Sequence, residues 1–187
     1  VHGRDLAVQP SADVLASWVP EIPDDVTVVL AVSPAVDQVP AEIWIPILKR
    51  ADIVTMNIRE TAAIREIINA HSPGTGLRNI MRPSAAMVRR LGSLGCDLQI
   101  SLEAEPILIR PFPSDTVDTT GVGDTHVAVM CAALLQGYDL VDACVRANAA
   151  AALMIQHAGT TPVPTKQQVE TVLKTGTAKG VGDVSCL

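Results

Sequence analysis

Apolar and polar positions in the first half of the chain predict short strands that alternate with helices. Residues 27–32 form an unbroken apolar run that ends at Ser33-Pro34, which is typical of a strand buried on both faces. Further strands are predicted at residues 53–56, 87–91, 98–101 and 107–110, the last two joined as a hairpin, and helices begin near Ser11, near Pro40 and over residues 60–70. Residues 71–83 are rich in Ser, Pro, Gly and Asn and predict a loop.

The second half of the chain, from Thr125 onward, is predicted to be helical. One apolar helix face is predicted by the spacing of Val127, Met130, Cys131, Leu134 and Leu135, and Gly137 ends that helix. A second helix runs from Asp139 to about His157, and a third begins at a capping box of Thr165 and Gln168. We therefore expect an α/β fold in one domain over residues 1–174, with a mainly parallel sheet flanked by helices, and a flexible tail over residues 175–187.

Composition and charge argue against several classes of protein. The 187 residues carry 14 Lys and Arg against 20 Asp and Glu, a net charge of −6, and no basic stripe for a nucleic-acid interface. The longest apolar runs fall short of the roughly 18 residues that a membrane span needs. The four cysteines have no CxxC spacing and the first residues show no signal-peptide pattern, so we expect a reduced, cytoplasmic compartment.

Residues 118–124, Asp-Thr-Thr-Gly-Val-Gly-Asp, lie between a predicted strand and a predicted helix and carry the clearest chemistry. Two glycines permit a tight turn, and the first amide N–H groups of the helix point back at it, which makes an anion site. Asp124 could then take a proton from a hydroxyl that attacks a bound phosphate. A plain glycine turn with Asp124 as a helix cap fits the same residues, and the segment alone leaves both interpretations open.

Four segments, in chain order, together carry a family resemblance. They are Asn-Ile-Arg-Glu at residues 57–60, Arg-Leu-Gly-Ser-Leu-Gly at residues 90–95, the glycine segment 118–124, and the alanine-rich helix that contains Asn148 and ends at Gly159. In this order they resemble the N-x-x-E, G-x-x-G, D-T-x-G-A-G-D and A-N-A motifs of the ribokinase-like (PfkB) sugar kinase family. The resemblance implies an α/β three-layer ribokinase-like fold.

The resemblance also implies a role for each matching residue. Asp124 would be the catalytic base, and the amides of Gly121, Val122 and Gly123 would form the anion hole for the γ-phosphoryl group of ATP. Glu60 would organise Mg²⁺ through water, and Asp118 with the Thr120 carbonyl would help to bind a monovalent cation such as K⁺. The residues implied at the nucleotide are Asn57, Arg90, Gly92, Ser93, Gly95, Gly123 and Asn148.

Taken singly, most of these residues also fit a structural role. Asn57 and Glu60 fit a helix capping box, and Gly92 with Gly95 fits a turn between two strands. A lone histidine such as His126 is more often structural than catalytic. Val122 and His126 replace the family's usual Ala and aromatic residue, and residues 159–164 match its cation-site strand poorly, which counts against K⁺ dependence.

The resemblance covers residues 3–173, as the C-terminal part of a family member. The N-terminal strands and the β-stranded lid of the family have no counterpart. We therefore expect that the native protein is longer, or that the isolated piece is unstable or self-associates. The predicted function is transfer of the γ-phosphoryl group of Mg-ATP to a sugar or nucleoside hydroxyl. The alternative is a non-catalytic nucleotide-binding or regulatory member, or an inactive fragment. No G-x-x-x-x-G-K-[ST] segment supports a P-loop enzyme, and whether the protein forms a homodimer is left open.

Overall fold

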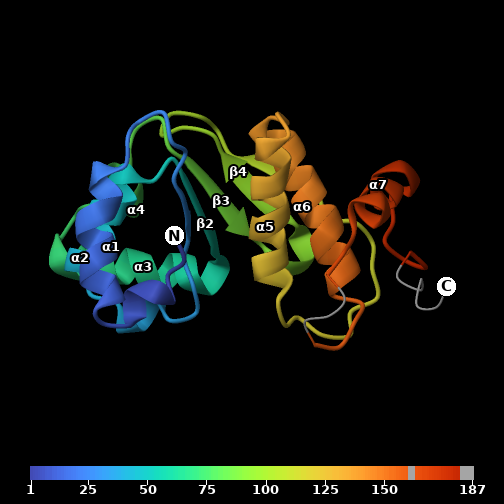
Figure 1. Ribbon diagram of the computed structural model, residues 1–187, viewed down its shortest axis with the longest axis horizontal. Coiled ribbons are helices and arrows are strands. Elements are labelled where there is room, and N and C mark those ends of the chain that lie inside the picture. Colours follow the sequence, from blue (N-terminus) through green and yellow to red (C-terminus); the bar gives the residue numbers. More distant parts are fainter. Residues whose placement is uncertain (160–162, 182–187) are drawn as a thin grey trace. The chain divides into compact units, whose positions relative to one another are not determined.

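The computed structural model describes residues 1–159 and 163–181 and divides into two compact units (Figure 1). Unit 1 comprises residues 1–91 and 97–107. Unit 2 comprises residues 92–96 and the described residues from 108 onward. Within the described residues, no helix is both long enough and apolar enough to cross a membrane.

The strands of the described chain form one five-stranded sheet in the order β1-β2-β3-β4-β5. Their bounds are β1 Val29–Ala31, β2 Ile53–Asn57, β3 Ala86–Arg90, β4 Cys96–Gln99 and β5 Ile107–Ile109. β1, β2 and β3 pair in parallel, with Ile53 opposite both Val29 and Ala86. The link from β3 to β4 is too short for a parallel crossover, which needs about a dozen residues. The sheet is therefore mixed, and all the predicted strands are confirmed with slightly different ends.

Four α-helices belong to the described part of unit 1. They are α1 Ser11–Trp18, α2 Ala41–Arg50, α3 Ile58–His71 and α4 Leu77–Ile80, and 3₁₀ turns occupy Asp5–Ala7, Val19–Glu21 and Val36–Gln38. Pro46 lies inside α2 without ending it. The prediction of a continuous loop over residues 71–83 was wrong in part, because α4 forms there and buries Leu77. Tertiary burial of one leucine outweighs the weak helix propensity of the surrounding polar residues.

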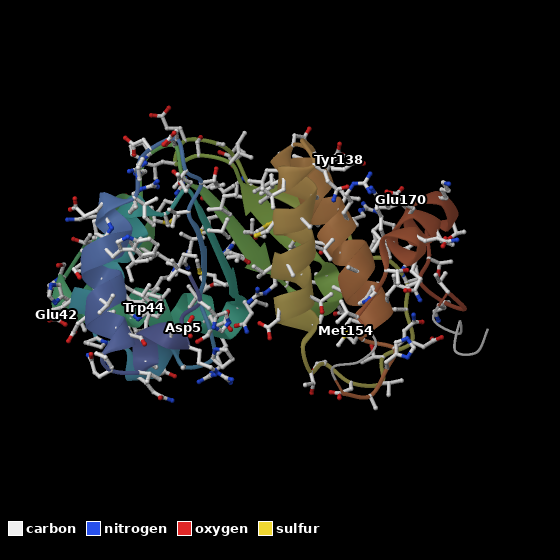
Figure 2. The ribbon with its side chains drawn as sticks, viewed as in Figure 1. Asp5, Glu42, Trp44, Tyr138, Met154 and Glu170 are labelled. Atoms are coloured by element: carbon white, nitrogen blue, oxygen red, sulfur yellow. The ribbon has the colours of Figure 1, made fainter. Side chains whose placement is uncertain are left out.

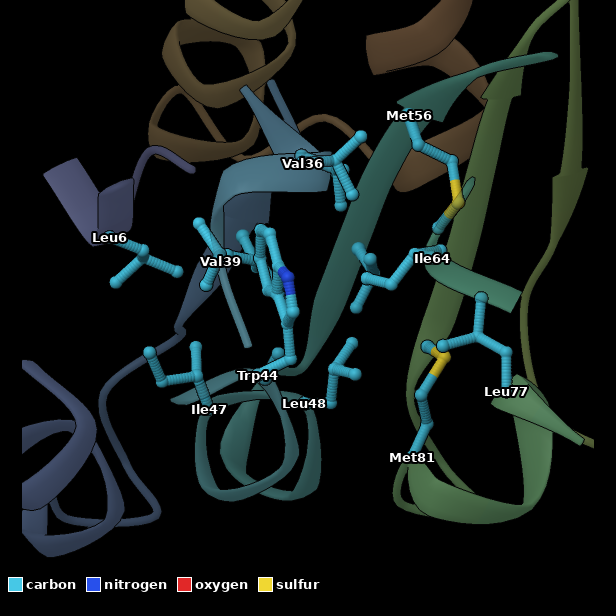
Figure 3. Close-up of a cluster of buried hydrophobic side chains, with 14 of the residues drawn as sticks. Leu6, Val36, Val39, Trp44, Ile47, Leu48, Met56, Ile64, Leu77 and Met81 are labelled. Carbon is cyan, nitrogen blue, oxygen red and sulfur yellow. The ribbon is translucent and has the colours of Figure 1, made fainter. Parts of the chain in front are cut away.

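Trp44 lies at the centre of the unit 1 core (Figure 3). Its side chain is fully buried, as are those of Ile47 and Leu48 on the same helix, because the spacing 44, 47, 48 places all three on one face of α2. Helix α3 adds Ile64, and β2 adds Met56. The helices of unit 1 are therefore held to the parallel strands by one continuous apolar cluster.

A buried arginine secures the loop that precedes β1. Arg50 is 3% exposed, and its guanidinium donates to the carbonyl oxygens of Ile22, Pro23 and Val26 at 2.9, 2.6 and 2.7 Å. It also pairs with Asp52 at 2.8 Å, and the same carboxylate accepts from the Val28 amide. Since each polar group finds a partner, the buried charge is tolerated.

Unit 2 is built on helices α5 Val122–Leu135, α6 Leu140–Met154 and α7 Lys166–Thr175, and the 3₁₀ turn Gly92–Leu94 also belongs to it. Helices α5 and α6 lie side by side (Figure 1), and the alanines of α6 allow a close approach. Arg146 of α6 stacks on the Tyr138 ring at 3.9 Å and pairs with Glu170 of α7 at 2.5 Å; Figure 2 labels these two partners of the arginine. Asp139 caps α6, and Thr165 with Gln168 forms the predicted capping box of α7.

The predicted buried face of α5 was wrong in detail. The buried residues of this helix are Thr125, His126, Met130 and Ala133, whereas Leu135 is 90% exposed. Apolar residues occur all round α5, so their spacing does not single out one face.

The first part of the predicted tail is packed against unit 2. Helix α7 ends at Gly176 (φ +75°), and Ala178 beyond it is fully buried. The Ala178 amide donates to the Pro113 carbonyl at 2.9 Å, and Gln156 donates to the Ala178 carbonyl at 3.0 Å. A single buried alanine, one backbone hydrogen bond and one hydrogen bond from a glutamine side chain thus anchor residues that composition alone assigned to the tail. Residues 182–187 lie outside the described part of the chain.

Candidate functional site

In unit 1, Asn57 and Glu60 form a reciprocal cap at the start of α3. The Glu60 amide donates to Asn57 Oδ1 at 2.8 Å, and the Asn57 amide donates to Glu60 Oε2 at 2.8 Å. The Asn57 side-chain amide also donates to Glu60 Oε1 at 3.0 Å. The two residues therefore form a capping box, which is the structural role that their sequence spacing also allowed. The cap fixes the Glu60 carboxylate at the carboxyl end of β2.

Arg90 of β3 adds a cation to this cap. Its guanidinium lies 3.0 Å from Glu60 Oε2 and 3.4 Å from the Thr55 hydroxyl. Glu60 is 2% and Arg90 15% exposed. Burial raises the pKa of the Glu60 carboxyl, while the Asn57 amide and the Arg90 charge act in the opposite direction. Neither the Glu60–Arg90 pair nor the part played by Thr55 was predicted, although Thr55 is the one polar residue inside an apolar strand segment.

The donor set around Glu60 fits a water-mediated magnesium role and not direct ligation. Both carboxylate oxygens already accept hydrogen bonds, and Arg90 places positive charge beside one of them. Among the side chains that the structure describes, no group of three or more His, Cys, Asp and Glu could hold a metal ion. Mg²⁺ commonly keeps several waters and takes only one or two carboxylates, so a single Glu60 acting through water is compatible with it.

Replacing Arg90 by Met is expected to lower the free energy of unfolding by about 3 kcal/mol at pH 7, since it leaves a buried carboxylate without its ion-pair partner. Burial already holds the pKa of the Glu60 carboxyl above its ordinary value of 4.5. The stability that the protonated carboxyl contributes is therefore fully present below pH 4.5 and is lost as the pH rises through the raised pKa. Without the Arg90 charge the pKa of Glu60 rises further, so the variant loses more free energy of unfolding at pH 7 than at pH 4.5. Urea unfolding at pH 4.5 and 7 measures this difference.

The matched control for that experiment is Arg59→Met. Arg59 pairs with Asp37 at 2.9 Å, but the two side chains are 64% and 58% exposed. An exposed pair contributes at most about 1 kcal/mol. Equal losses for the two variants, or a loss at Arg90 that does not change with pH, would contradict the buried-pair interpretation.

In unit 2, the G-x-x-G segment is an exposed turn between β3 and β4. Gly92 and Gly95 have φ of +61° and +89°, and the Gly95 amide donates to the Gly92 carbonyl at 3.1 Å. Gly92 and Ser93 are exposed, whereas Gly95 is buried. A Cβ at Gly95 would lie 2.2 Å from the Ile109 carbonyl oxygen, so only glycine fits this close approach to the backbone of β5.

Gly95→Ala is expected to lower the free energy of unfolding by about 2–5 kcal/mol, because left-handed strain adds to a forced backbone displacement. Gly92→Ala is the control: its φ is also positive, but a Cβ there meets no atom within 4 Å. Gly92→Ala is therefore expected to lower the free energy of unfolding by only about 1–2 kcal/mol, the cost of a left-handed backbone at alanine. Urea unfolding of both variants gives the comparison, and similar losses would mean that the approach to Ile109 contributes nothing.

Asp118 fastens the glycine segment 118–124 to the residues that follow α6. Its Oδ1 accepts from the Thr120 amide and hydroxyl at 2.9 and 2.8 Å, and its Oδ2 accepts from the Gly159 amide at 2.8 Å. These donors, the Gly159 amide first, hold the pKa of Asp118 below its ordinary value. The sequence prediction used Asp118 as a cation ligand and missed its bond to Gly159. Residues 160–162 of the predicted cation-site strand lie outside the described part of the chain.

The glycine segment leads directly into α5. Gly121 is the cap residue of the helix with φ +73°, and the Thr125 amide donates to its carbonyl at 2.9 Å. The Val122 amide makes only a long, 3.4 Å bond to the Thr119 carbonyl. Asp124 lies in the first helical turn, where its carboxylate is exposed. The arrangement presents helix amides and a carboxylate at one helix start, which suits an anion and a proton acceptor together.

The side chain of Asn148 on α6 forms hydrogen bonds with other residues of the protein. Its side-chain amide donates to the carbonyls of Ile109 and Arg110 at 3.0 and 3.2 Å, and its Oδ1 lies 3.2 Å from His126 Nε2. Asn148 is 5% and His126 2% exposed. Asn148 thus fixes the end of β5 to α6, and its predicted place beside adenosine stays a prediction.

Each unit therefore brings together a distinct part of the predicted site. Unit 1 joins Asn57, Glu60 and Arg90, and unit 2 contains the turn 92–95, the segment 118–124 and Asn148.

Comparison with known proteins supports a common origin with sugar kinases. The model of the pfkB family carbohydrate kinases matches residues 26–166, which span both units. An uncharacterised sugar kinase of Escherichia coli K12, YegV, is 30% identical over 169 residues, which cover 89% of this chain and 51% of that protein.

Solved structures show the same fold. The nucleoside kinase of Methanocaldococcus jannaschii matches with a TM-score of 0.76 at 20% identity, over 88% of this chain and 53% of that one. The ribokinase of Arabidopsis thaliana, solved with ribose and ATP, matches with a TM-score of 0.72 at 26% identity, over 87% of this chain and 53% of that one. The chain thus spans about half the length of these relatives.

Proposed function

Because the chain belongs to the pfkB carbohydrate kinase family, we propose that it takes part in transfer of the γ-phosphoryl group of ATP to a hydroxyl of a sugar or nucleoside. The observation that carries the proposal is the geometry of residues 118–124. Asp118 holds the segment in place, and Asp124 lies in the first turn of the helix that follows. The Arabidopsis ribokinase, solved with ribose and ATP, supports the choice of nucleotide and of a sugar acceptor.

In this proposal Asp124 acts as the general base. Its carboxylate accepts the proton of the acceptor hydroxyl as that oxygen attacks the γ-phosphorus. The amides at residues 121–123 donate to the oxygens of the phosphoryl group as negative charge develops on them. Because these donors belong to a fixed helix start, little reorganisation is needed during the reaction.

The remaining residues bind and position the nucleotide. The turn 92–95 lies along the nucleotide, to which its residues Gly92 and Ser93 are exposed, whereas Gly95 packs against the backbone of β5. Glu60, which Asn57 and Arg90 hold in place, would bind Mg²⁺ through water. When bound, Mg²⁺ neutralises phosphate charge. The bonds of Asp118 to Gly159 and Thr120 give it a loop-positioning role, and its part in binding a monovalent cation stays a prediction.

The test is sugar-dependent release of ADP from Mg-ATP, screened over pentoses, hexoses and nucleosides. Release that one acceptor stimulates, with the phosphorylated product found by mass spectrometry, supports the proposal. Binding of ATP without turnover for any acceptor would favour the alternative of a non-catalytic nucleotide-binding member. That alternative is worth testing because the chain spans about half the length of its relatives.

A further inference from the structure

A buried histidine on α5 connects three elements of unit 2. His126 follows Asp124 by two residues on this helix and is 2% exposed. Its Nε2 lies 3.2 Å from Oδ1 of Asn148 on α6. The Asn148 side-chain amide donates in turn to the carbonyl oxygens of Ile109 and Arg110, at 3.0 and 3.2 Å. One chain of hydrogen bonds therefore runs from the start of α5 through α6 to the end of β5.

The hydrogen bonds of Asn148 determine which nitrogen of the His126 ring carries the proton. Both N–H groups of the Asn148 amide are used by carbonyl oxygens, and its Oδ1 can only accept. A flipped amide would place Oδ1 against the same two carbonyl oxygens, where no hydrogen lies between them. His126 must therefore donate from Nε2 to Asn148.

The second ring nitrogen of His126 favours a neutral ring. Nδ1 is buried, and no residue in the described part of the chain forms a hydrogen bond with it. A proton on Nδ1 would bury a charged ring and an N–H group without an acceptor, whereas a lone pair there leaves only an unused acceptor. The ring is therefore a donor at Nε2 and carries a lone pair at Nδ1.

We propose that His126 is a positioning residue, which holds the first turn of α5 in place through its Nε2–H bond to Asn148. This turn carries Asp124 and begins at the amides of residues 121–123. Successive residues of a helix move together because backbone hydrogen bonds join them, so the position of His126 sets the position of this turn. The effect on turnover rests on the proposed function, whereas the link itself does not.

Loss of the ring N–H would leave a polar atom unsatisfied in the interior. Asn148 is 5% exposed, so water cannot readily replace His126 as the donor to its Oδ1. The surrounding interior is close-packed, and the unsatisfied oxygen is relieved only if α5, α6 or the Asn148 side chain moves. Removing the donor should therefore displace the start of α5.

The first experiment uses the unaltered chain. Nuclear magnetic resonance of the nitrogen-labelled protein at neutral pH shows which ring nitrogen of each histidine carries a proton, and His126→Gln identifies the signals of His126 by their loss. We expect a proton on Nε2 and none on Nδ1. A proton on Nδ1 alone, a doubly protonated ring, or rapid exchange between the two tautomers would overturn the proposal.

Three variants then test the link itself. The glutamine of His126→Gln can place an N–H group where Nε2 of the ring lies, whereas the shorter His126→Asn reaches only the place of Nδ1. His126→Phe keeps a ring of similar size but has no donor. The backbone amide shifts of residues 121–125 should stay close to those of the unaltered chain with Gln and move with Asn and Phe. Equal changes in all three variants, or no change in any, would contradict the link.

Turnover separates positioning from a purely structural role. His126→Phe should lower kcat roughly 10-fold, less than the about 10²-fold cost of a 1 Å misplacement, with less than about a threefold change in KM for ATP. His126→Gln should restore most of the lost kcat. A Phe variant that unfolds more easily but keeps the parent kcat would make His126 structural only. If the unaltered chain turns over no acceptor, the proposed function fails, and the amide shifts alone decide the role of His126.

Discussion

Replacing Asp124 by Asn is expected to lower sugar-dependent turnover by about 10²- to 10⁴-fold, the usual contribution of a positioned general base. The amide has nearly the same size as the carboxylate but accepts no proton at neutral pH. The backbone amides of residues 121–123 are unchanged, so ATP affinity is expected to change by less than about threefold, given that exposed charge–dipole effects at a helix start are below about 1 kcal/mol. Initial rates of ADP release and calorimetric titration with ATP measure the two quantities.

Asp142→Asn is the matched control for this experiment. Asp142 also lies, exposed, in the first turn of a helix, where it interacts with the helix dipole but belongs to no predicted site. Both variants lose one negative charge at a helix start, so only the proton acceptor distinguishes them. Near-normal turnover in Asp124→Asn, or equal losses in the two variants, would rule out Asp124 as the base.

Trp44→Ala is expected to lower the free energy of unfolding by about 3–5 kcal/mol, the typical cost of removing a large buried aromatic side chain. Trp44 is fully buried at the centre of the unit 1 core, in one apolar cluster with residues of α2, α3 and the parallel strands. No neighbour can move far enough to fill the space, because the surrounding side chains are themselves fixed by strands and helices. Urea unfolding followed by far-ultraviolet circular dichroism measures the loss.

Trp44→Phe provides the control for cavity size. It removes less volume, and it also removes an indole N–H that is buried without a hydrogen-bond partner. Loss of an unsatisfied donor offsets part of the lost packing, so a much smaller destabilisation is expected than for alanine. If the two variants unfolded at the same urea concentration, the volume of the indole would not be what stabilises unit 1.

Local patterns predicted local structure well. The caps at Asn57 with Glu60, at Asp139 and at Thr165 with Gln168 involve residues three apart, so their sequence spacing is sufficient to define them. The family motifs likewise identified segments whose geometry is set by glycines and helix starts. By contrast, the buried face of α5 depends on what packs against a helix that is apolar all round, and no spacing reveals that.

Interactions between distant residues were the ones that sequence reasoning missed. Glu60 and Arg90 are 30 positions apart, and Asp118 and Gly159 are 41 apart. Glu60, Arg90 and Asp118 were each singled out for a ligand, and each proved to have a protein partner as well. A motif records which residue types occur together, whereas the sharing of one carboxylate between several donors becomes visible only when the chain is folded.

The bond between Asp118 and Gly159 gives the glycine segment a distant spectroscopic reporter. The Gly159 amide is tied to the same carboxylate that holds Thr120, so a change in the segment's position alters the environment of a nucleus far along the chain. The chemical shift and hydrogen exchange of that single amide therefore register the state of residues 118–124. Ligand titrations can be followed at Gly159 by nuclear magnetic resonance without placing a label in the segment itself.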